Sequence, residues 1–251
     1  MSKIVLITGA SRGLGRNMAE HLAERGRDII LTYHSRSDDA QTVVESIEAR
    51  GRKAVALQLE VGESAGFSDF ASRLKAVLAQ HWDRQDFDYL INNAGSGVFT
   101  PFMETTEEEF TRMLNEHLKA PFFLSQTLLP LMKDGGRIVN ISSGLTRMTF
   151  PGFAAYATMK AGLETLSVYM AKELGERRIS VNTLAPGAIE TDFGGGYVRD
   201  TPEVNQHIAA ITALGRVGLP DDIGGAVAAL LDDGAGWITG QRIEASGGQS
   251  I

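Results

Sequence analysis

The sequence contains no cysteine among its 251 residues. This absence excludes disulfides, thiol nucleophiles and metal sites built from thiolates. Its 24 lysines and arginines are outnumbered by 31 aspartates and glutamates, which gives a net charge of −7, and the basic residues form no dense cluster. A groove for nucleic acid or a patch for an anionic membrane is therefore not indicated. We expect neither a nucleic-acid partner nor a metal site.

Long apolar runs are also missing from the chain. The run IVLI at positions 4–7 is too short for a signal peptide, and no later run reaches the roughly 18 apolar residues of a membrane span. We therefore expect a cytoplasmic protein without a membrane partner. No internal repeat or second domain is evident, and 251 residues suffice for one α/β domain with a substantial core.

Strand-like and helix-like segments alternate along the sequence. Apolar and β-branched runs predict strands at 3–8, 28–34, 54–61, 88–95, 137–143, 179–187 and within 237–248, and helical periodicity marks 16–25 and 38–49. Such alternation predicts right-handed β-α-β units on a parallel sheet. We expect a single-domain, Rossmann-like, doubly wound parallel α/β sheet of about seven strands over residues 1–251.

A glycine-rich turn follows the first predicted strand. The segment Thr8–Gly15 reads TGASRGLG, so Gly9, Gly13 and Gly15 stand where a strand turns into a helix. Glycines at such a turn let backbone N–H groups and the helix N-terminus approach a diphosphate. The spacing G-x-x-x-G-x-G differs from the common G-x-G-x-x-G fingerprint. A turn whose glycines only pack a strand–helix corner is the alternative at this point.

Three later residues form a candidate catalytic group. Tyr156 and Lys160 are four residues apart and so share one face of a helix, and Ser143 precedes Tyr156 by thirteen positions. A phenol, with an ordinary pKa of about 10, shuttles protons near neutral pH only when its phenolate is stabilised, which a lysine ammonium one turn away can do. Ser143 can hydrogen-bond the oxygen of a carbonyl or carbinol. Because a Y-x-x-x-K pair is common by chance, this assignment depends on the motifs around it.

Five motifs occur in order along the chain: TGASRGLG, NNAG at Asn92–Gly95, NISS at Asn140–Ser143, YATMK at Tyr156–Lys160 and PGAIET at Pro186–Thr191. With these motifs at these separations, nearly the whole chain resembles the short-chain dehydrogenase/reductase family. The resemblance implies that Tyr156 is the general acid/base, that Ser143 orients the substrate, and that Lys160 lowers the pKa of Tyr156 and binds the nicotinamide ribose. It also implies that residues 192–218, which carry little pattern, form a mobile substrate lid, and that the chain assembles as a dimer or tetramer.

The residues that follow the second predicted strand indicate whether the protein binds NAD or NADP(H). NAD-binding folds usually carry an acidic residue there, whereas this chain reads Tyr33-His34-Ser35-Arg36. Arg36 can fork to a phosphate, and Arg12 in the glycine turn supplies a second cation, so NADP(H) is predicted. The alternative is that both arginines are solvated surface cations. The predicted cofactor-binding residues are Gly9, Ser11, Arg12, Gly13, Leu14, Gly15, His34, Ser35, Arg36, Glu60, Val61, Asn92, Ala94, Gly95, Tyr156, Lys160, Pro186, Gly187, Ile189 and Thr191.

Glu60 and His117 depart from the family's pattern. Glu60 stands where family members commonly carry an aspartate facing the adenine. The family's fourth catalytic residue is an asparagine on the helix after NNAG, and aligning LKAPFF at 118–123 with that pattern puts His117 there, with Asn115 on another face of the helix. An imidazole can anchor the water that connects Lys160 to solvent, and it titrates near its reference pKa of about 6.5. We therefore expect an ionisation of kcat between roughly pH 5.5 and 7.5 that His117→Asn abolishes; a histidine that only packs is the alternative.

Together these features predict an NADPH-dependent carbonyl reductase acting on a small-molecule substrate, or the reverse reaction as an alcohol dehydrogenase. Reduction of 3-oxoacyl-carrier-protein is an alternative of the same class, although Pro130 stands where a basic residue for the carrier would be expected and only Lys172 remains. A non-catalytic NADP(H)-binding sensor or scaffold is an alternative of another class, but it would not need the hydroxyl of Tyr156. An apolar, partly aromatic pocket, or else core packing, is indicated by Met148, Phe150, Phe153, Phe193 and Tyr197.

Overall fold

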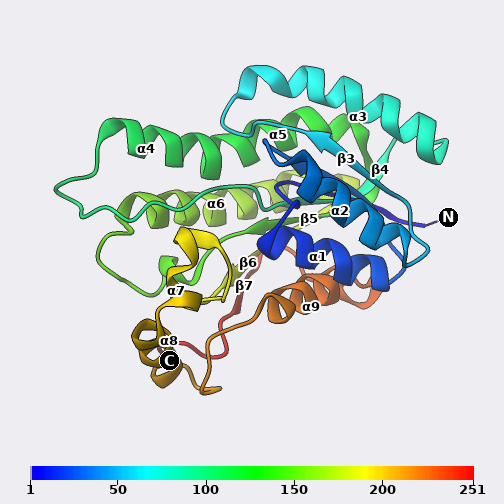
Figure 1. Ribbon diagram of the computed structural model, residues 1–251. Coiled ribbons are helices and arrows are strands. Elements are labelled where there is room, and N and C mark those ends of the chain that lie inside the picture. The colour runs from blue at the N-terminus through cyan, green and yellow to red at the C-terminus, as the bar shows by residue number, and fades with distance from the viewer. Residues whose placement is uncertain (1) are drawn as a thin grey trace.

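Seven short apolar runs form one parallel sheet in the computed structural model, which describes residues 2–251 (Figure 1). Hydrogen-bonded neighbours follow the order β3-β2-β1-β4-β5-β6-β7, and every pair is parallel. The predicted doubly wound sheet is thereby confirmed. The strands are β1 (Ile4–Ile7), β2 (Asp28–Tyr33), β3 (Ala54–Gln58), β4 (Phe87–Asn92), β5 (Met132–Ile141), β6 (Ser180–Pro186) and β7 (Arg242–Ala245).

Helices cover both faces of this sheet (Figure 1). One face packs against α1 (Gly13–Glu24), α2 (Ser37–Glu48) and α9 (Pro220–Leu230), and the other against α3 (Phe67–Trp82), α5 (Ala120–Leu128) and α6 (Ala154–Glu173). Alternate residues of β1 serve the two cores: Val5 and Ile7 face the first, and Ile4 and Leu6 face the second. Burial on both faces explains why this strand reads as a continuous apolar run. Within residues 2–251, no helix combines the length and apolar character that a membrane crossing requires.

Shorter elements complete the chain. They are α4 (Glu107–Leu114), α7 (Tyr197–Asp200), α8 (Pro202–Ala210), a π-helical turn η2 (Asn115–Lys119), and the 3₁₀ turns η1 (Ser64–Gly66), η3 (Leu129–Leu131), η4 (Gly144–Thr146), η5 (Gly175–Arg177), η6 (Phe193–Gly196) and η7 (Asp233–Ala235). The turn η2 joins α4 to α5 without an interruption of the helical path. Turns of this kind are frequent at functional sites.

Most element boundaries differ by one to three residues from the sequence predictions, and β4 ends at Asn92 rather than at 95. Strand β3 ends at Gln58 rather than at 61, because its pairing with β2 ends where Gln58 meets Tyr33. Strand β5 begins at Met132 rather than at 137, since Met132 pairs with Phe87 across a shift in register. Helix α1 begins at Gly13, inside the glycine turn, rather than at 16.

The 192–218 segment is not the unpatterned stretch that was predicted, because it contains α7 and α8. Its two ends are joined: Gly218 N–H donates to the carbonyl of Ala188 at 3.0 Å, and Glu190 N–H donates to the carbonyl of Gly218 at 2.9 Å. The C-terminal residues border the segment, since Ser250 N–H donates to the carbonyl of Ile211 at 2.7 Å. Figure 1 shows α8 beside the C-terminus, with α7 between it and the sheet.

Candidate active site

The carboxyl ends of four neighbouring strands bring the sequence motifs together. Beyond β1 lies Gly9, beyond β4 lie Ala94 and Gly95, beyond β5 lies Ser143, and beyond β6 lies Gly187. Parallel strands end at a common edge, and the sheet order reverses between β1 and β4. Such a reversal is where doubly wound sheets bind their ligands. Motifs that are more than a hundred residues apart in the chain therefore line one crevice.

Close packing accounts for two of the three glycines in the first turn. Gly9 has φ +64°, and a Cβ there would lie 2.8 Å from Cα of Ala94, while a Cβ at Gly15 would overlap the carbonyl oxygen of Gly9. Gly13 differs, because φ is +55° but a Cβ would meet nothing within 4 Å. The space in front of Gly13 and the first turn of α1 is therefore open to a ligand.

The NNAG segment holds the glycine turn in place through Asn93. Its Nδ2 donates to the carbonyls of Thr8 at 2.9 Å and Gly9 at 3.1 Å, and its N–H donates to Oγ1 of Thr8 at 2.9 Å. Asn92, the predicted residue, turns its amide into the core and donates to Oδ1 of Asn140 at 2.8 Å. Sequence reasoning missed Asn93, although it is the second asparagine of the motif.

Tyr156, Lys160 and Ser143 meet as the sequence predicts. Helix α6 buries Tyr156 and Lys160 on one face, with Nζ of Lys160 at 5.5 Å from the centre of the tyrosine ring and 2.7 Å from the carbonyl of Ile141. Ser143 caps η4, where its Oγ accepts from Leu145 N–H at 3.2 Å. The hydroxyl of Ser143 lies near that of Tyr156, where it can hydrogen-bond the phenolate. Two hydroxyls thus converge beside a buried lysine.

Burial dominates the protonation of this group. It raises the pKa of Tyr156 above its ordinary value, against the opposing effect of the Ser143 hydrogen bond. It also lowers the pKa of Lys160 to about 7, against the opposing charge of Glu116. The pKa of Tyr156 is therefore raised overall, because desolvation of the buried phenol is the largest effect on it. That Lys160 lowers this pKa stays a prediction. Tyr156 is protonated at neutral pH, as a proton donor must be.

His117 lies on the π-helical turn η2 and is only 2% exposed. Its Nε2 lies 2.6 Å from the carbonyl oxygen of Ser96. A carbonyl can only accept, so Nε2 carries the proton and Nδ1 is left as an acceptor. Nδ1 is buried and has no hydrogen-bond partner in the part of the chain that the structure describes. Asn115 is half-buried on another face, where it lines a cavity of about 410 Å³ with Glu60.

The imidazole of His117 is held neutral. Burial lowers its pKa well below the ordinary value, and the charge of Lys160 lowers it further, while the hydrogen bond to Ser96 opposes both. The predicted ionisation of His117 between pH 5.5 and 7.5 is therefore wrong. The sequence could place His117 beside Lys160, but the degree of its burial depends on helix packing that no local pattern reports.

Gly95 lies against the ring of His117, and a Cβ at this glycine would overlap the ring. Glu116 completes the contact, since its Oε2 accepts from the N–H and the hydroxyl of Ser96, each at 2.7 Å. Two adjacent residues of η2 thus clamp the loop that follows NNAG. Sequence reasoning did not single out Glu116 or Ser96.

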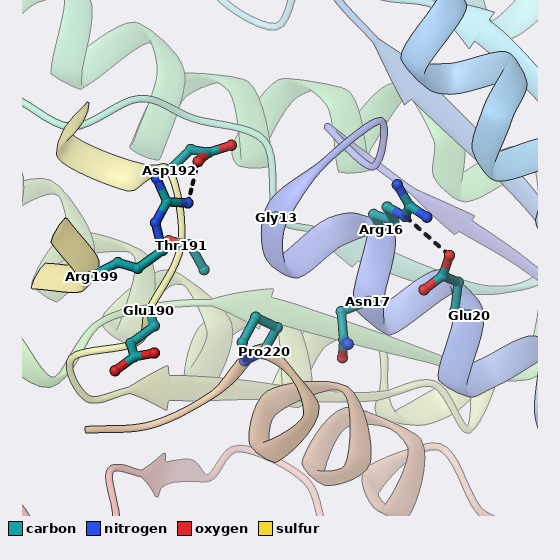
Figure 2. Close-up of a pocket in the computed structure, with 9 residues that line it drawn as sticks. All are labelled: Gly13, Arg16, Asn17, Glu20, Glu190, Thr191, Asp192, Arg199 and Pro220. Carbon is teal, nitrogen blue, oxygen red and sulfur yellow. Dashed lines mark hydrogen bonds and ion pairs between the residues drawn. The ribbon is translucent and has the colours of Figure 1, made fainter. Parts of the chain in front are cut away.

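A cavity of about 260 Å³ lies between the start of α1 and the 192–218 segment (Figure 2). The close-up shows Arg16, Asn17 and Glu20 projecting from α1, and Asp192 and Arg199 facing each other across the cavity from them. Arg199 Nη1 donates to Oδ1 of Asp192 at 2.5 Å. The remaining lining residues are Gly13, Glu190, Thr191 and Pro220. The N-terminus of α1, the helix that follows the glycine turn, therefore borders this cavity.

Arg12 and Arg36, the predicted phosphate ligands, lie near one carboxylate. Nη1 of Arg12 is 3.9 Å from Oδ2 of Asp192. The hydrogen bond from Arg199 is the main cause that lowers the pKa of Asp192, and the charges of Arg12 and Arg36 add to it. Arg36 also pairs with Asp39 at 3.2 Å. The structure thus brings both predicted cations to the same side of the crevice.

Two of the predicted cofactor-binding residues, His34 and Glu60, contact each other. His34 Nε2 is 2.5 Å from Oε2 of Glu60, and Oε1 of Glu60 accepts from Gly62 N–H at 2.9 Å. Val61 packs on the core, whereas Ser35 is exposed. Both carboxylate oxygens of Glu60 therefore already have partners.

The PGAIET segment is tied to the C-terminus by a residue that sequence reasoning missed. Oε1 of the buried Gln249 accepts from Ala188 N–H at 2.9 Å, and a Cβ at Gly187 would lie 2.8 Å from the same oxygen. Ile189 bridges to Gly218, and Thr191 accepts from Phe193 N–H at 3.2 Å. No local motif marks Gln249, because it is 61 residues from its partner.

One aromatic side chain lies beside Tyr156, and two others meet near the start of its helix. Phe193 lies 5.7 Å from the tyrosine ring, and Phe99 and Phe153 meet edge-on at 5.4 Å between centroids. Phe99 is 70% exposed and Phe193 is 45% exposed. Tyr197 is exposed and Phe150 is half-buried, whereas Met148 is buried against Gly144, as the core-packing alternative expected. Phe99, which sequence reasoning missed, belongs to this apolar group.

Comparisons with known proteins cover almost the whole chain. A family model described as enoyl-(acyl carrier protein) reductase matches residues 9–250. A hydroxynaphthalene reductase-like protein, Arp2 of Metarhizium brunneum, is 36% identical over 257 aligned residues, which cover 98% of this chain and 94% of that protein.

Solved structures agree with these sequence matches. The angucycline C-6 ketoreductase LanV with bound NADP superposes with a TM-score of 0.93 at 40% identity, covering 99% of this chain and 95% of the other. A promiscuous reductase, LugOII, which catalyses keto-reduction at C1 during lugdunomycin biosynthesis, also gives a TM-score of 0.93, at 38% identity and with 99% and 98% covered.

Proposed function

Since this chain belongs to the short-chain dehydrogenase/reductase family, we propose that it reduces a ketone with NADPH and that Tyr156 delivers the proton. The protein is an NADP-dependent oxidoreductase that acts on C=O or CH–OH groups. The single observation that carries the proton role is the meeting of the Ser143 and Tyr156 side chains beside buried Lys160. Both hydroxyls stand at the carboxyl edge of the sheet, where ligands of this fold bind.

In the proposed reaction, Ser143 and Tyr156 both act on the carbonyl oxygen of the substrate. NADPH supplies a hydride to the carbonyl carbon when it is bound. Ser143 donates a hydrogen bond to the carbonyl oxygen, and Tyr156 donates its proton to that oxygen as negative charge develops there. The Lys160 ammonium stabilises the resulting phenolate. A pKa of Lys160 of about 7 leaves this cation partly populated at neutral pH.

His117 would act through its unprotonated Nδ1. Because Nε2–H is committed to Ser96, Nδ1 can accept from a water or from Lys160 but cannot itself donate. We propose that it holds a water that returns a proton toward Lys160 and Tyr156. Its burial beside both residues supports this role. A buried acceptor left without a partner would be costly.

The residues at the predicted cofactor site fit NADP(H). The first turn of α1 reads Gly-Leu-Gly-Arg, and within residues 2–251 no side chain caps its N–H groups, so they can receive a diphosphate. Arg12 lies 3.9 Å from Asp192, and the charges of Arg12 and Arg36 both act on that carboxylate, which supports a place where two cations could meet a 2′-phosphate. We propose that these two arginines hold that phosphate, and that the loop from Pro186 to Thr191 faces the nicotinamide.

A polycyclic aromatic ketone is the substrate class that we infer. The similar proteins are named for hydroxynaphthalene and for angucycline reduction. Phe193 beside Tyr156, and the pair of Phe99 and Phe153 near the start of α6, provide apolar faces on which fused rings can stack. Since the matching family model is described as a carrier-protein reductase, an acyl thioester belongs in the same substrate panel.

We further propose that residues 1–251 act as one cytoplasmic domain, with 192–218 closing over the substrate. Joined ends at Ala188 and Gly218 make that segment a loop with a fixed base. Exposed apolar side chains on α4, α5 and α6 support a homo-oligomer, a dimer or tetramer that buries them. These are Phe110, Phe122, Phe123, Val168 and Tyr169. Light scattering after size exclusion measures the oligomeric state.

Replacement of the phenol hydroxyl tests the proposed function. Tyr156→Phe should lower kcat for ketone reduction by at least about 10²-fold, while the Kd for NADPH stays within about twofold, because only proton transfer is removed. The matched control is Tyr169→Phe, an exposed tyrosine on the same helix, which should keep full activity. Near-normal turnover of Tyr156→Phe on every ketone and thioester tested would contradict the mechanism and favour a binding protein.

A further inference from the structure

Glu164 forms a polar junction behind the proposed catalytic group. It follows Lys160 by one turn of α6 and is 18% exposed. One carboxylate oxygen, Oε1, accepts from Oγ of Ser142 at 2.6 Å, Oγ1 of Thr146 at 2.8 Å and Nε of Arg242 at 2.9 Å. Three donors from two separate segments thus meet on a single atom. Charge-assisted bonds of this kind are the stronger and more directional ones.

Two of these donors bracket Ser143. Ser142 directly precedes it and is 2% exposed, and Thr146 closes the η4 turn that Ser143 begins, with Oγ1 at 3.0 Å from the carbonyl oxygen of Ser143. Tyr156 lies two helical turns before Glu164 on the same helix. Glu164 therefore connects the loop that carries one hydroxyl to the helix that carries the other.

The junction continues outward to β7 and the C-terminus. Arg242 Nη1 donates to Oε2 of Glu244 at 3.0 Å, and Arg147 donates to both oxygens of Glu244 at 2.6 and 2.9 Å. Arg147 also donates to the carbonyl of Gln249 at 2.6 Å. The hydrogen bonds from Arg147 are the largest cause that lowers the pKa of Glu244 to about 2, so this outer pair stays ionised throughout the neutral range.

We propose that Glu164 is a positioning residue that sets the spacing between the Ser143 and Tyr156 hydroxyls. The inference rests on the proposed function, in which both hydroxyls act on one carbonyl oxygen. Hydrogen bonds to Glu164 restrain the loop on both sides of Ser143 relative to α6, so their loss lets Oγ of Ser143 move without unfolding either element. Displacements of about 1 Å at a reacting centre cost on the order of 100-fold in rate.

Glu164→Ala is the primary test, and hydride transfer is measured in a single turnover of the preformed NADPH complex. The rate per bound NADPH should fall about 10- to 100-fold, while the Kd for NADPH stays within about twofold. Arg242 keeps Glu244 as its partner, so no charge is stranded. A purely stabilising role would lower the amount of NADPH bound but not the rate per bound NADPH. Glu173→Ala, an exposed carboxylate on the same helix, is the matched control and should behave as the wild type.

A variant that restores a hydrogen-bond acceptor at position 164 provides a second test. Glu164→Gln keeps an oxygen that can accept from Ser142 and Thr146, so it should recover most of the rate. Ser142→Ala removes one hydrogen bond and leaves Glu164 with two partners. It should also lower the rate of hydride transfer, and it provides the test if Glu164→Ala does not fold. In the double variant Ser142→Ala/Glu164→Ala, the two losses should not add, because they remove one shared contact.

Three results decide the matter. Wild-type transfer per bound NADPH in Glu164→Ala, or in Ser142→Ala where Glu164→Ala is not folded, would overturn the proposal. So would a slow Glu164→Gln that matches Glu164→Ala, because a retained acceptor would then not position the loop. Tyr156→Phe in the same assay separates failure of the proposed function from failure of the positioning role. If Tyr156→Phe transfers hydride normally, the proposed function fails. If only the Glu164 variants transfer hydride normally, the positioning role alone fails.

Discussion

The imidazole of His117 meets the ring of Tyr156 edge-on, with centroids 5.0 Å apart and ring planes at 83°. The Nε2–H group of His117 donates a hydrogen bond to the carbonyl oxygen of Ser96. The remaining nitrogen therefore lies beside the proposed proton donor as a neutral acceptor. This arrangement differs from a titrating histidine, since burial and Lys160 both disfavour the imidazolium.

The first prediction concerns what His117 supplies. His117→Asn keeps a polar group and should retain kcat within about tenfold, whereas His117→Leu removes the acceptor and should lower kcat about 10²-fold, the lower range for general acid–base groups. The pH profile of His117→Asn should have the same shape as that of the wild type between pH 5.5 and 7.5, because neutral His117 does not titrate there. Steady-state profiles of the three proteins make the comparison. Full activity of His117→Leu would leave the histidine a packing role only.

The second prediction is a pH dependence that arises from Lys160. Because protonated Lys160 stabilises the phenolate, kcat/KM for reduction should fall as pH rises through about 7, the pKa to which burial lowers this lysine. Glu116 faces Lys160 and raises that pKa, so Glu116→Gln should move the inflection to lower pH and slow reduction at pH 7. Tyr156 and His117 also face the lysine, but the first stays protonated and the second neutral in this range.

Glu108→Gln is the control for this shift, because Glu108 lines the same cavity as Glu116 without acting on Lys160. Its pH profile should superimpose on that of the wild type. An inflection that stays in place in Glu116→Gln would mean that another group controls the rate.

Local patterns predicted the sheet because β1, β2, β4 and β6 are almost fully buried. The ordered motifs pointed to Ser143, Tyr156 and Lys160 because the family resemblance assigns those positions. The protonation states were not predictable, since the pKa of Tyr156 depends on burial that forms only when α6 packs against η2. Gln249 and Glu164 were missed for a related reason. Their partners, Ala188 and Arg242, are 61 and 78 residues away, so no periodicity or motif records the contact.

The third prediction tests the proposed phosphate site. Arg36→Ala and Arg12→Ala should each weaken NADPH binding about 10- to 100-fold and leave NADH binding unchanged, because charged hydrogen bonds to a 2′-phosphate are lost. Arg25→Ala is the matched control, since Arg25 follows the far end of α1 and pairs with Asp232. Fluorescence titration with both cofactors measures the effect. Equal losses for NADPH and NADH would show that neither arginine reads the 2′-phosphate.

The last prediction concerns Asp192, whose carboxylate stands between Arg199 and Arg12 at the edge of the cavity in Figure 2. In the proposed site, the phosphates of NADPH bring several negative charges close to Asp192. Arg12 cannot pair fully with Asp192 and with a 2′-phosphate at the same time. Asp192→Asn should therefore bind NADPH about two- to fivefold more tightly, the range expected for an exposed ion pair. The gain should shrink as ionic strength rises.

Asp200→Asn separates this effect from a general loosening of the 192–218 segment, because Asp200 also pairs with Arg199 but not with Arg12. Titration of the three proteins with NADPH at two salt concentrations provides the comparison. If Asp200→Asn tightens binding equally, release of Arg199 is the cause. If Asp192→Asn instead weakens binding, the contact between Asp192 and Arg12 holds the segment over the cofactor rather than competing with it, and the sign of the change distinguishes the two arrangements.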